Sequence, residues 1–131
     1  MDDQKLHFPF TSLQRLTHAK EFEAAFKARN SARGVRIIVH GLANGLTWSR
    51  LGLSVGRKFG NAVARNRFKR LCREAFRLLQ HELPQGWDFV LSPVLPAKSD
   101  PEGKDRWRTI TLEEIKIDLA AKTQQLARRK R

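Results

Sequence analysis

Residues 57–77, RKFGNAVARNRFKRLCREAFR, constrain this chain more than any other segment. The segment holds eight Lys or Arg residues and one acid, Glu74, and its apolar residues recur at helical spacing. On a wheel that advances about 100° per residue, the apolar residues occupy one continuous side, which predicts a helix with a core-facing stripe. The stripe consists of Phe68, Leu71, Cys72, Ala75, Phe76, Leu78 and Leu79.

Another side of the same predicted helix carries most of its charge. An arc of about 100° on the wheel contains Asn66, Lys69, Arg70, Arg73 and Arg77. Like charges at i,i+4 disfavour an isolated helix by about 0.2–0.5 kcal/mol per pair. The alternative reading is a solvated helix face, but such faces usually mix both signs of charge. A run of one sign therefore indicates that this helix binds a polyanion.

The overall charge supports the same interpretation. The chain has 131 residues, which predicts one domain with one modest core. Its formal net charge is +13 and its pI is about 11.1, which favours nucleic acid or an anionic surface as the partner. Residues 78–127 hold more acids than bases, so the basicity is concentrated in the predicted helix.

Cysteine usage and the N-terminal sequence exclude several classes of protein. The single cysteine, Cys72, excludes a disulfide framework and a cysteine zinc site. The sequence MDDQKLHFPF has acids where a signal peptide has bases, and no apolar run approaches the length of a membrane span. We therefore expect a reduced, cytoplasmic protein that does not associate with membranes.

The first part of the chain predicts one helix. Residues 1–12 have no periodicity and are expected to form a flexible arm. Thr17 is the expected N-cap of a helix over about residues 18–29. Phe22 and Phe26 lie on its apolar face at i,i+4, where they either pack in the core or form the wall of a groove.

The next segment predicts two strands joined by a tight turn. Residues 30–34 read as a loop, and residues 35–40 alternate as a strand does. Asn44-Gly45 is the pair that a type I′ hairpin turn prefers, which predicts an antiparallel return strand over residues 47–55. Gly52 in that strand has no side chain, which permits a bulge or the close approach of a backbone or a ligand.

The remaining elements follow from capping and turn residues. Asn61 is expected to cap the basic helix, which continues to about Glu82. Residues 87–92 form a short apolar strand, and the helix between the strands makes it a candidate parallel neighbour of residues 47–55.

Residues 93–108 are expected to be a long loop. A capping box then opens a last helix at Thr111-Leu112-Glu113-Glu114, and residues 128–131 form a basic tail.

No arrangement typical of an active site appears in the sequence. His7, His18, His40 and His81 are isolated, and no metal-binding spacing occurs. Cys72 lies on the apolar side of the predicted helix, where a thiol is usually inert. If the protein takes part in catalysis, we expect the catalytic groups to belong to a partner.

Residues 52–77 resemble the signature of the protein subunit of bacterial ribonuclease P. That signature is Ala-Val-x-Arg-Asn-Arg, then an apolar residue and Lys/Arg-Arg-x-x-Arg. Residues 15–29 resemble the family's first helix, and residues 87–93 resemble the strand that follows the basic helix. The matching residues of the signature are Ala62, Val63, Arg65, Asn66, Arg67, Lys69, Arg70 and Arg73.

The resemblance implies a single domain over residues 1–131 with an α+β fold. The expected architecture is a small two-layer α/β sandwich of order αβββαβα with a left-handed βαβ crossover. It contains one strand more than the periodicity alone predicts, and we expect this short strand within residues 47–55.

The resemblance also implies the function and the site residues. The family's holoenzyme hydrolyses one phosphodiester of precursor tRNA and so releases its 5′ leader, with Mg²⁺ held mainly by the catalytic RNA. The protein itself is expected to carry no catalytic and no metal-binding residue. The residues expected to bind the catalytic RNA are Arg57, Lys58, Asn61, Arg65, Asn66, Arg67, Lys69, Arg70, Arg73 and Arg77. Those expected to line a groove for the leader are Phe22, Phe26, Ile38 and His40.

Arg65 and Arg67 lie on opposite sides of the charged arc of the wheel. A shared role in RNA docking therefore requires the N-terminus of the helix to abut the RNA.

Some features depart from the family pattern. The first strand has Ile38, Val39 and His40 where relatives often carry an aromatic residue, and Ser92-Pro93-Val94 stands where they often have a basic one. The 93–108 loop is longer than usual, and its basic residues and Trp107 either add an RNA contact or form a solvated loop.

Two rival functions remain open. One is a structural RNA-binding protein of ribosomal type without linked nuclease activity, and the other is a DNA-binding basic helix.

Overall fold

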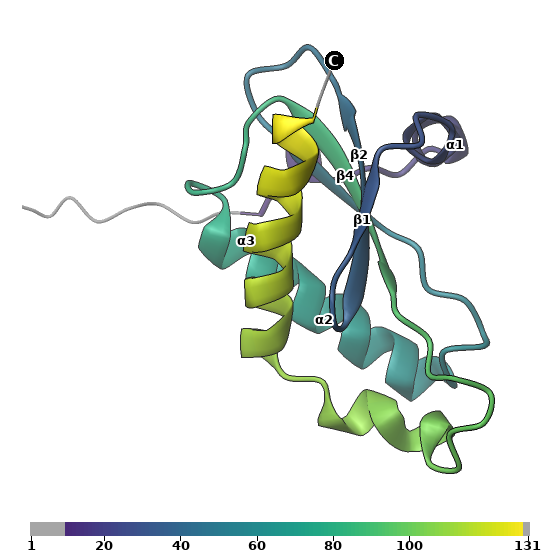
Figure 1. Cartoon of the computed structure of the whole chain (residues 1–131). Helices are drawn as coiled ribbons and strands as arrows, with labels where there is room; N and C mark the ends of the chain where they lie inside the picture. The colour runs from purple at the N-terminus through teal and green to yellow at the C-terminus, as the bar shows by residue number, and fades with distance from the viewer. Residues whose placement is uncertain (1–9, 130–131) are drawn as a thin grey trace, which may run out of the picture.

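The computed structural model describes residues 10–129. A four-stranded sheet separates α2 and α3, which cover one face, from α1, which crosses the other (Figure 1). The larger core cluster lies between the sheet, α2 and α3, and a smaller one of Leu16, Ala25 and Val90 lies under α1.

The helices and strands confirm the α+β class and the order αβββαβα. Two 3-10 helices, η1 and η2, add to that order. The elements are η1 (Ser12–Gln14), α1 (Ala19–Lys27), β1 (Ser31–Arg33), β2 (Ile37–Ala43), β3 (Arg50–Leu53), α2 (Ala62–Leu79), β4 (Trp87–Pro93), η2 (Gly103–Thr109) and α3 (Leu112–Arg128). Among residues 10–129, no helix is long and apolar enough to span a membrane.

The predicted hairpin is wrong, because β4 lies between its two strands. The sheet order is β1-β2-β4-β3, with β4 antiparallel to β2 and parallel to β3, as expected for a β3-α2-β4 unit. Phe89, Val90 and Leu91 of β4 are fully buried, and a strand that is apolar on both faces needs a central position. The turn at Asn44 and Gly45 exists, but only Gly45 has a positive φ.

The additional short strand is not within residues 47–55 but is β1, in a segment that we predicted to be a loop. Three residues are too few to show the alternation that predicts a strand. The turn from β1 to β2 is held by Asp118 of α3, whose buried carboxylate accepts hydrogen bonds from the amides of Val35, Arg36 and Ile37 at 3.1, 2.6 and 3.1 Å.

The basic helix forms as its periodicity predicts. Asn61 is the N-cap, and its side-chain oxygen accepts a hydrogen bond from the amide of Ala64 at 2.9 Å. The buried residues are Ala64, Phe68, Cys72, Ala75, Phe76 and Leu79. Burial raises the pKa of the Cys72 thiol, which therefore belongs to the inert core. The helix ends at Leu79 rather than at Glu82.

Several other boundaries differ from those predicted. The N-cap of α1 is His18 rather than Thr17, and the Glu21 carboxylate accepts hydrogen bonds from both of their amides at 3.2 Å. The capping box at Thr111 is confirmed. The 93–108 segment is not a plain loop, because it contains most of η2.

The two ends of the described chain are more structured than an arm and a tail. Residues 1–9 of the predicted arm and residues 130–131 of the predicted tail lie outside the described residues. Phe10 packs edge-on against Phe76, with ring centroids 5.7 Å apart. Arg128 is the last residue of α3, and Arg129 donates hydrogen bonds to Asn30 and Ser31.

Candidate nucleic-acid interface

The outward face of α2 carries cations that have no partner among the residues that the structure describes. Asn66, Arg70 and Arg73 are exposed, and Lys69 is half-buried on the side toward Phe22 and Leu53. Within residues 10–129, Lys69, Arg70 and Arg73 form no hydrogen bond or ion pair. Three neighbouring charges without counter-ions in this part of the chain give the face a positive potential, which suits an anionic ligand.

An open hollow beside this face contains one further cation that the sequence did not indicate. Phe10 and Arg15 line it together with Asn66, Arg70, Arg73, Glu74 and Arg77 of α2. The Arg15 guanidinium lies over the Phe10 ring, 5.0 Å from its centroid. Arg15 lies outside the basic segment, so only the tertiary fold brings it to α2.

Arg77 differs from the other predicted RNA-binding cations because it forms an ion pair. Its guanidinium donates to both oxygens of Glu74, at 3.0 and 2.7 Å. The hydrogen bond from Arg77 lowers the pKa of the Glu74 carboxyl. The pair therefore offers less net charge to a ligand than Arg70 or Arg73.

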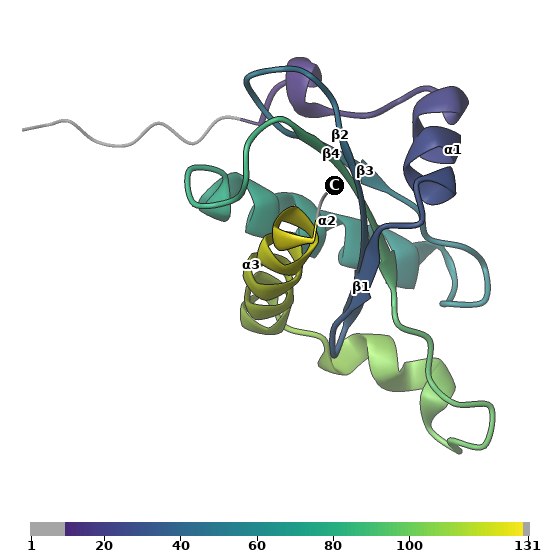
Figure 2. The ribbon, with the colours of Figure 1, turned by 45° about the horizontal axis from the view of Figure 1, so that its top comes forward.

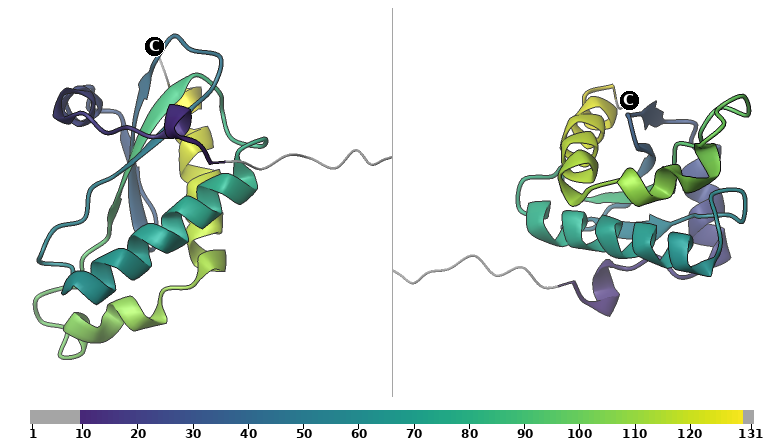
Figure 3. Two further views of the ribbon diagram at one scale, coloured as in Figure 1. Left: turned by 180° about the vertical axis from the view of Figure 1, so that it is seen from behind. Right: turned by 90° about the horizontal axis from the view of Figure 1, so that it is seen from below.

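Arg65 and Arg67 leave α2 on opposite flanks of its N-terminal part. Arg65 donates to the Gly60 carbonyl at 2.7 Å, and Arg67 donates to the Trp107 carbonyl in η2 at 2.8 Å. Figure 3 shows α2 on the outside of the molecule with η2 beside its first turns. The exposed Arg57 and Lys58 lie in the loop that leads to the same end. Most of the predicted cations therefore surround the N-terminal half of α2.

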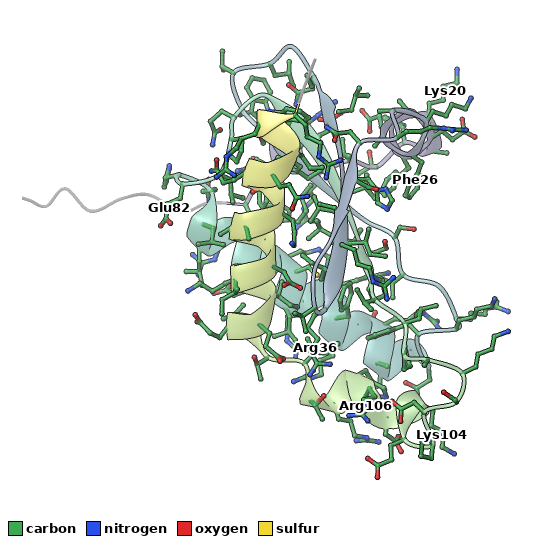
Figure 4. The ribbon with its side chains drawn as sticks, viewed as in Figure 1. Lys20, Phe26, Arg36, Glu82, Lys104 and Arg106 are labelled. Carbon is green, nitrogen blue, oxygen red and sulfur yellow. The ribbon has the colours of Figure 1, made fainter. Side chains whose placement is uncertain are left out.

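On the other face of the sheet, α1 and β2 bring together two of the predicted groove residues. The rings of Phe26 and His40 meet edge to face, with centroids 4.7 Å apart. Phe26 is 39% exposed, and Figure 4 shows it between α1 and the sheet. Burial lowers the pKa of His40, so the imidazole is neutral at pH 7.

Phe22 is placed differently from Phe26. It packs against the small cluster of Leu16, Ala25 and Val90. It also lies so close to Gly52 that a Cβ there would be 2.8 Å from the Phe22 ring, so a side chain occupies the space that we predicted for a backbone or a ligand. The structure thus distinguishes the two rings: Phe22 is partly buried against this cluster, whereas Phe26 is the more exposed ring.

Strand β1 adds a cation to this face of the sheet. Its register pairs Ser31 with His40 and Arg33 with Ile38, so these four residues share one face. Arg33 is exposed and Ile38 is half-buried. Arg33 was not among the predicted site residues, because residues 30–34 were expected to form a loop.

A model of the Ribonuclease P family matches residues 10–104. The chain belongs to the ribonuclease P protein family. The ribonuclease P protein component of Thermotoga petrophila is 39% identical over 98 residues, which cover 75% of this chain and 84% of that relative.

Solved ribonuclease P proteins share this fold. The structure of the protein from Thermotoga maritima matches with a TM-score of 0.68 at 31% identity and covers 82% of this chain and 96% of its own. A structure of the Staphylococcus aureus ribonuclease P protein matches with a TM-score of 0.65 at 26% identity, covering 87% and 94% of the two chains.

As a ribonuclease P protein component, the chain is the RNA-binding subunit of a ribonucleoprotein endoribonuclease that processes tRNA. Most of η2 lies beyond the residues that the family model matches. The Arg67 contact with Trp107 therefore joins the family's basic helix to a segment outside that match.

The side chains of residues 10–129 form no cluster typical of a metal site built from protein ligands alone. Among residues 10–129, no three His, Cys, Asp or Glu residues form a group that could hold a metal ion. The four predicted leader-binding residues include one metal-binding type, His40, and its imidazole packs against Phe26.

Proposed function

We propose that the outward face of α2 binds the catalytic RNA of ribonuclease P, and that the face between α1 and the sheet binds the 5′ leader of precursor tRNA. The observation that carries the first part is the group of unpaired cations, Lys69, Arg70 and Arg73, on the helix that bears the family's signature. Each phosphate that they neutralise releases counter-ions, so affinity depends steeply on salt.

The helix N-terminus is the expected centre of this contact. Arg65 and Arg67 diverge to opposite flanks, so a single RNA surface reaches both only if it covers the first turns of α2. Their backbone hydrogen bonds hold each guanidinium in place and leave further N–H donors for phosphate.

The leader site rests on different chemistry. Phe26 offers a partly exposed ring, His40 supports that ring, and Ile38 and Arg33 continue the face along the sheet. Aromatic rings stack on unpaired bases with little sequence preference, and Arg33 suits the backbone phosphate. Such a face accommodates leaders of varied sequence.

The hydrolysis itself belongs to the RNA in this proposal. In this proposal the catalytic RNA would hold most of the Mg²⁺, and the ion would supply the activation of water for attack on the phosphodiester. The protein side chains contribute by binding and orienting the two RNA molecules.

The deciding experiment adds the purified protein to ribonuclease P RNA and precursor tRNA at low Mg²⁺. We expect cleavage at the mature 5′ end to increase strongly over RNA alone. No gain in cleavage would instead favour a structural RNA-binding protein of ribosomal type. Competition with duplex DNA tests the remaining rival, since a DNA-binding helix would prefer the duplex to structured RNA.

Replacing Phe26 with Leu is expected to reduce affinity for precursor tRNA by about 5- to 150-fold, because stacking on one base contributes about 1–3 kcal/mol. Affinity for mature tRNA, which lacks a leader, should change little. Both affinities are measured by titrating tRNA into the protein–RNA complex.

Phe22→Leu is the matched control for this experiment. Because Phe22 is partly buried and packs against the cluster of Leu16, Ala25 and Val90, its replacement is expected to lower the melting temperature without selectivity for the leader. Equal losses for precursor and mature tRNA with Phe26→Leu would contradict the leader site.

A further inference from the structure

A second basic hollow lies at the end of the sheet where α3 stops. Figure 2 turns this end toward the viewer, whereas η2 lies at the opposite end. The hollow measures about 490 Å³ and is lined by the three residues that follow α1, the last three residues of β2, the residue that follows α3, and Trp87. The hollow exists because β1 is shorter than β2. The Gly41 amide donates the last backbone hydrogen bond of this pairing to the carbonyl of Asn30, the residue before β1. Beyond it, Leu42 and Ala43 of β2 have no partner in β1.

Two arginines line this hollow and no acid does. They are Arg29, just after α1, and Arg129, just after α3. Arg129 donates to the Asn30 side-chain oxygen at 3.3 Å and to the Ser31 carbonyl at 2.9 Å. These acceptors are neutral, so they orient the guanidinium without cancelling its charge. Arg29 has no hydrogen bond or ion pair through its side chain within the described chain.

The backbone of Arg29 gives an independent reason to regard its charge as functional. Its φ is 55°, and it is the only residue other than glycine with a positive φ in residues 10–129. The position follows the C-cap of α1, where glycine is the usual residue because a side chain strains this conformation. Here a strained position carries an arginine whose side chain forms no hydrogen bond or ion pair with any other residue of the 10–129 range.

We propose that Arg29 and Arg129 bind a phosphodiester group of RNA at this hollow, separately from the α2 face. A guanidinium presents paired N–H donors that match two phosphate oxygens. A phosphate between the two arginines also reduces the repulsion between two like charges that have no acid among the residues lining the hollow. The inference rests on the proposed RNA-binding role for its partner. The phosphate belongs either to the catalytic RNA or to precursor tRNA.

Arg29→Gly tests this site, because it removes the charge and relieves the backbone strain together. We expect the melting temperature to stay the same or to rise. One phosphate contact is worth about 0.7–0.9 in the slope of log K against log salt, which corresponds to about five- to eightfold in affinity at 0.1 M salt. Two titrations are compared: one adds catalytic RNA to the protein, and the other adds precursor tRNA to the assembled complex. The smaller salt slope and the lower affinity are expected in only one of them, and that titration identifies the source of the phosphate.

Two matched variants serve as controls. Arg29→Lys keeps the charge and should retain the salt slope. Lys20→Ala removes a charge from the start of the same helix, where the side chain projects away from the sheet (Figure 4), and should also leave the slope unchanged.

The outcome also separates this site from the α2 face. An unchanged slope for Arg29→Gly in both titrations, with a reduced slope for Arg73→Ala, would overturn the second site and leave the α2 proposal standing. Unchanged slopes for both variants would overturn both. A reduced slope for Arg29→Gly with a melting temperature no lower than that of the parent supports the second site.

Discussion

Replacing Lys69, Arg70 and Arg73 together with alanine is expected to weaken binding of the catalytic RNA by about 100- to 500-fold at 0.1 M salt. Each lost phosphate contact lowers the slope of log K against log salt by about 0.7–0.9, so the slope should fall by about 2 to 3. None of the three side chains has a partner in residues 10–129, so their charge is available to the RNA. Titrations over a range of salt concentrations measure both quantities.

The same variant should fold at least as well as the parent protein. Lys69 and Arg73 repel each other at i,i+4, and their removal relieves about 0.2–0.5 kcal/mol. The matched control replaces Lys20, Lys116 and Lys122 with alanine. These substitutions remove the same total charge, but from α1 and α3. An equal loss of affinity in this control would mean that net charge alone, rather than the α2 face, attracts the RNA.

Asp118→Ala is expected to lower the free energy of unfolding by about 3 kcal/mol, since it leaves three backbone amides without their acceptor. The Asp118 side chain is almost fully buried. The Ile37 amide, which donates a hydrogen bond to it, is buried too. This carboxylate joins α3 to the turn between β1 and β2, so its loss removes a long-range link. Urea denaturation followed by circular dichroism measures the change.

Glu113→Ala on the same helix is the control, because this exposed carboxylate makes only a 4.0 Å contact with Lys116. A change within about 0.5 kcal/mol is expected there. Asp118→Asn keeps one oxygen acceptor and should fall between the two variants. If Asp118→Ala costs no more than Glu113→Ala, the carboxylate does not hold the turn.

The local elements could be predicted well because their signals lie within a few residues. The buried stripe of α2, its cationic face and the Asn61 cap all depend on spacings of three or four residues. The capping box at Thr111 is equally local. Helix ends were less accurate, since His18 rather than Thr17 begins α1 and α2 ends three residues early.

Strand pairing could not be predicted in the same way. The Asn44-Gly45 signal favoured a hairpin, yet the apolar strand β4 takes the place between β2 and β3. Alternation along a strand shows which side chains share a face but not which strand lies beside it. Burying β4 on both faces outweighs the local preference of the turn.

The sequence by itself determined the basic helix, its core stripe, its cationic face and the family to which the chain is similar. Only the tertiary structure decided that Arg15 joins the α2 face, that Arg33 lies beside Ile38, and that Arg29 and Arg129 share a hollow. The physical reason is the range of the interactions. Helix faces follow from spacing within one segment, whereas these clusters depend on side chains brought together from distant parts of the chain by the packing of the sheet.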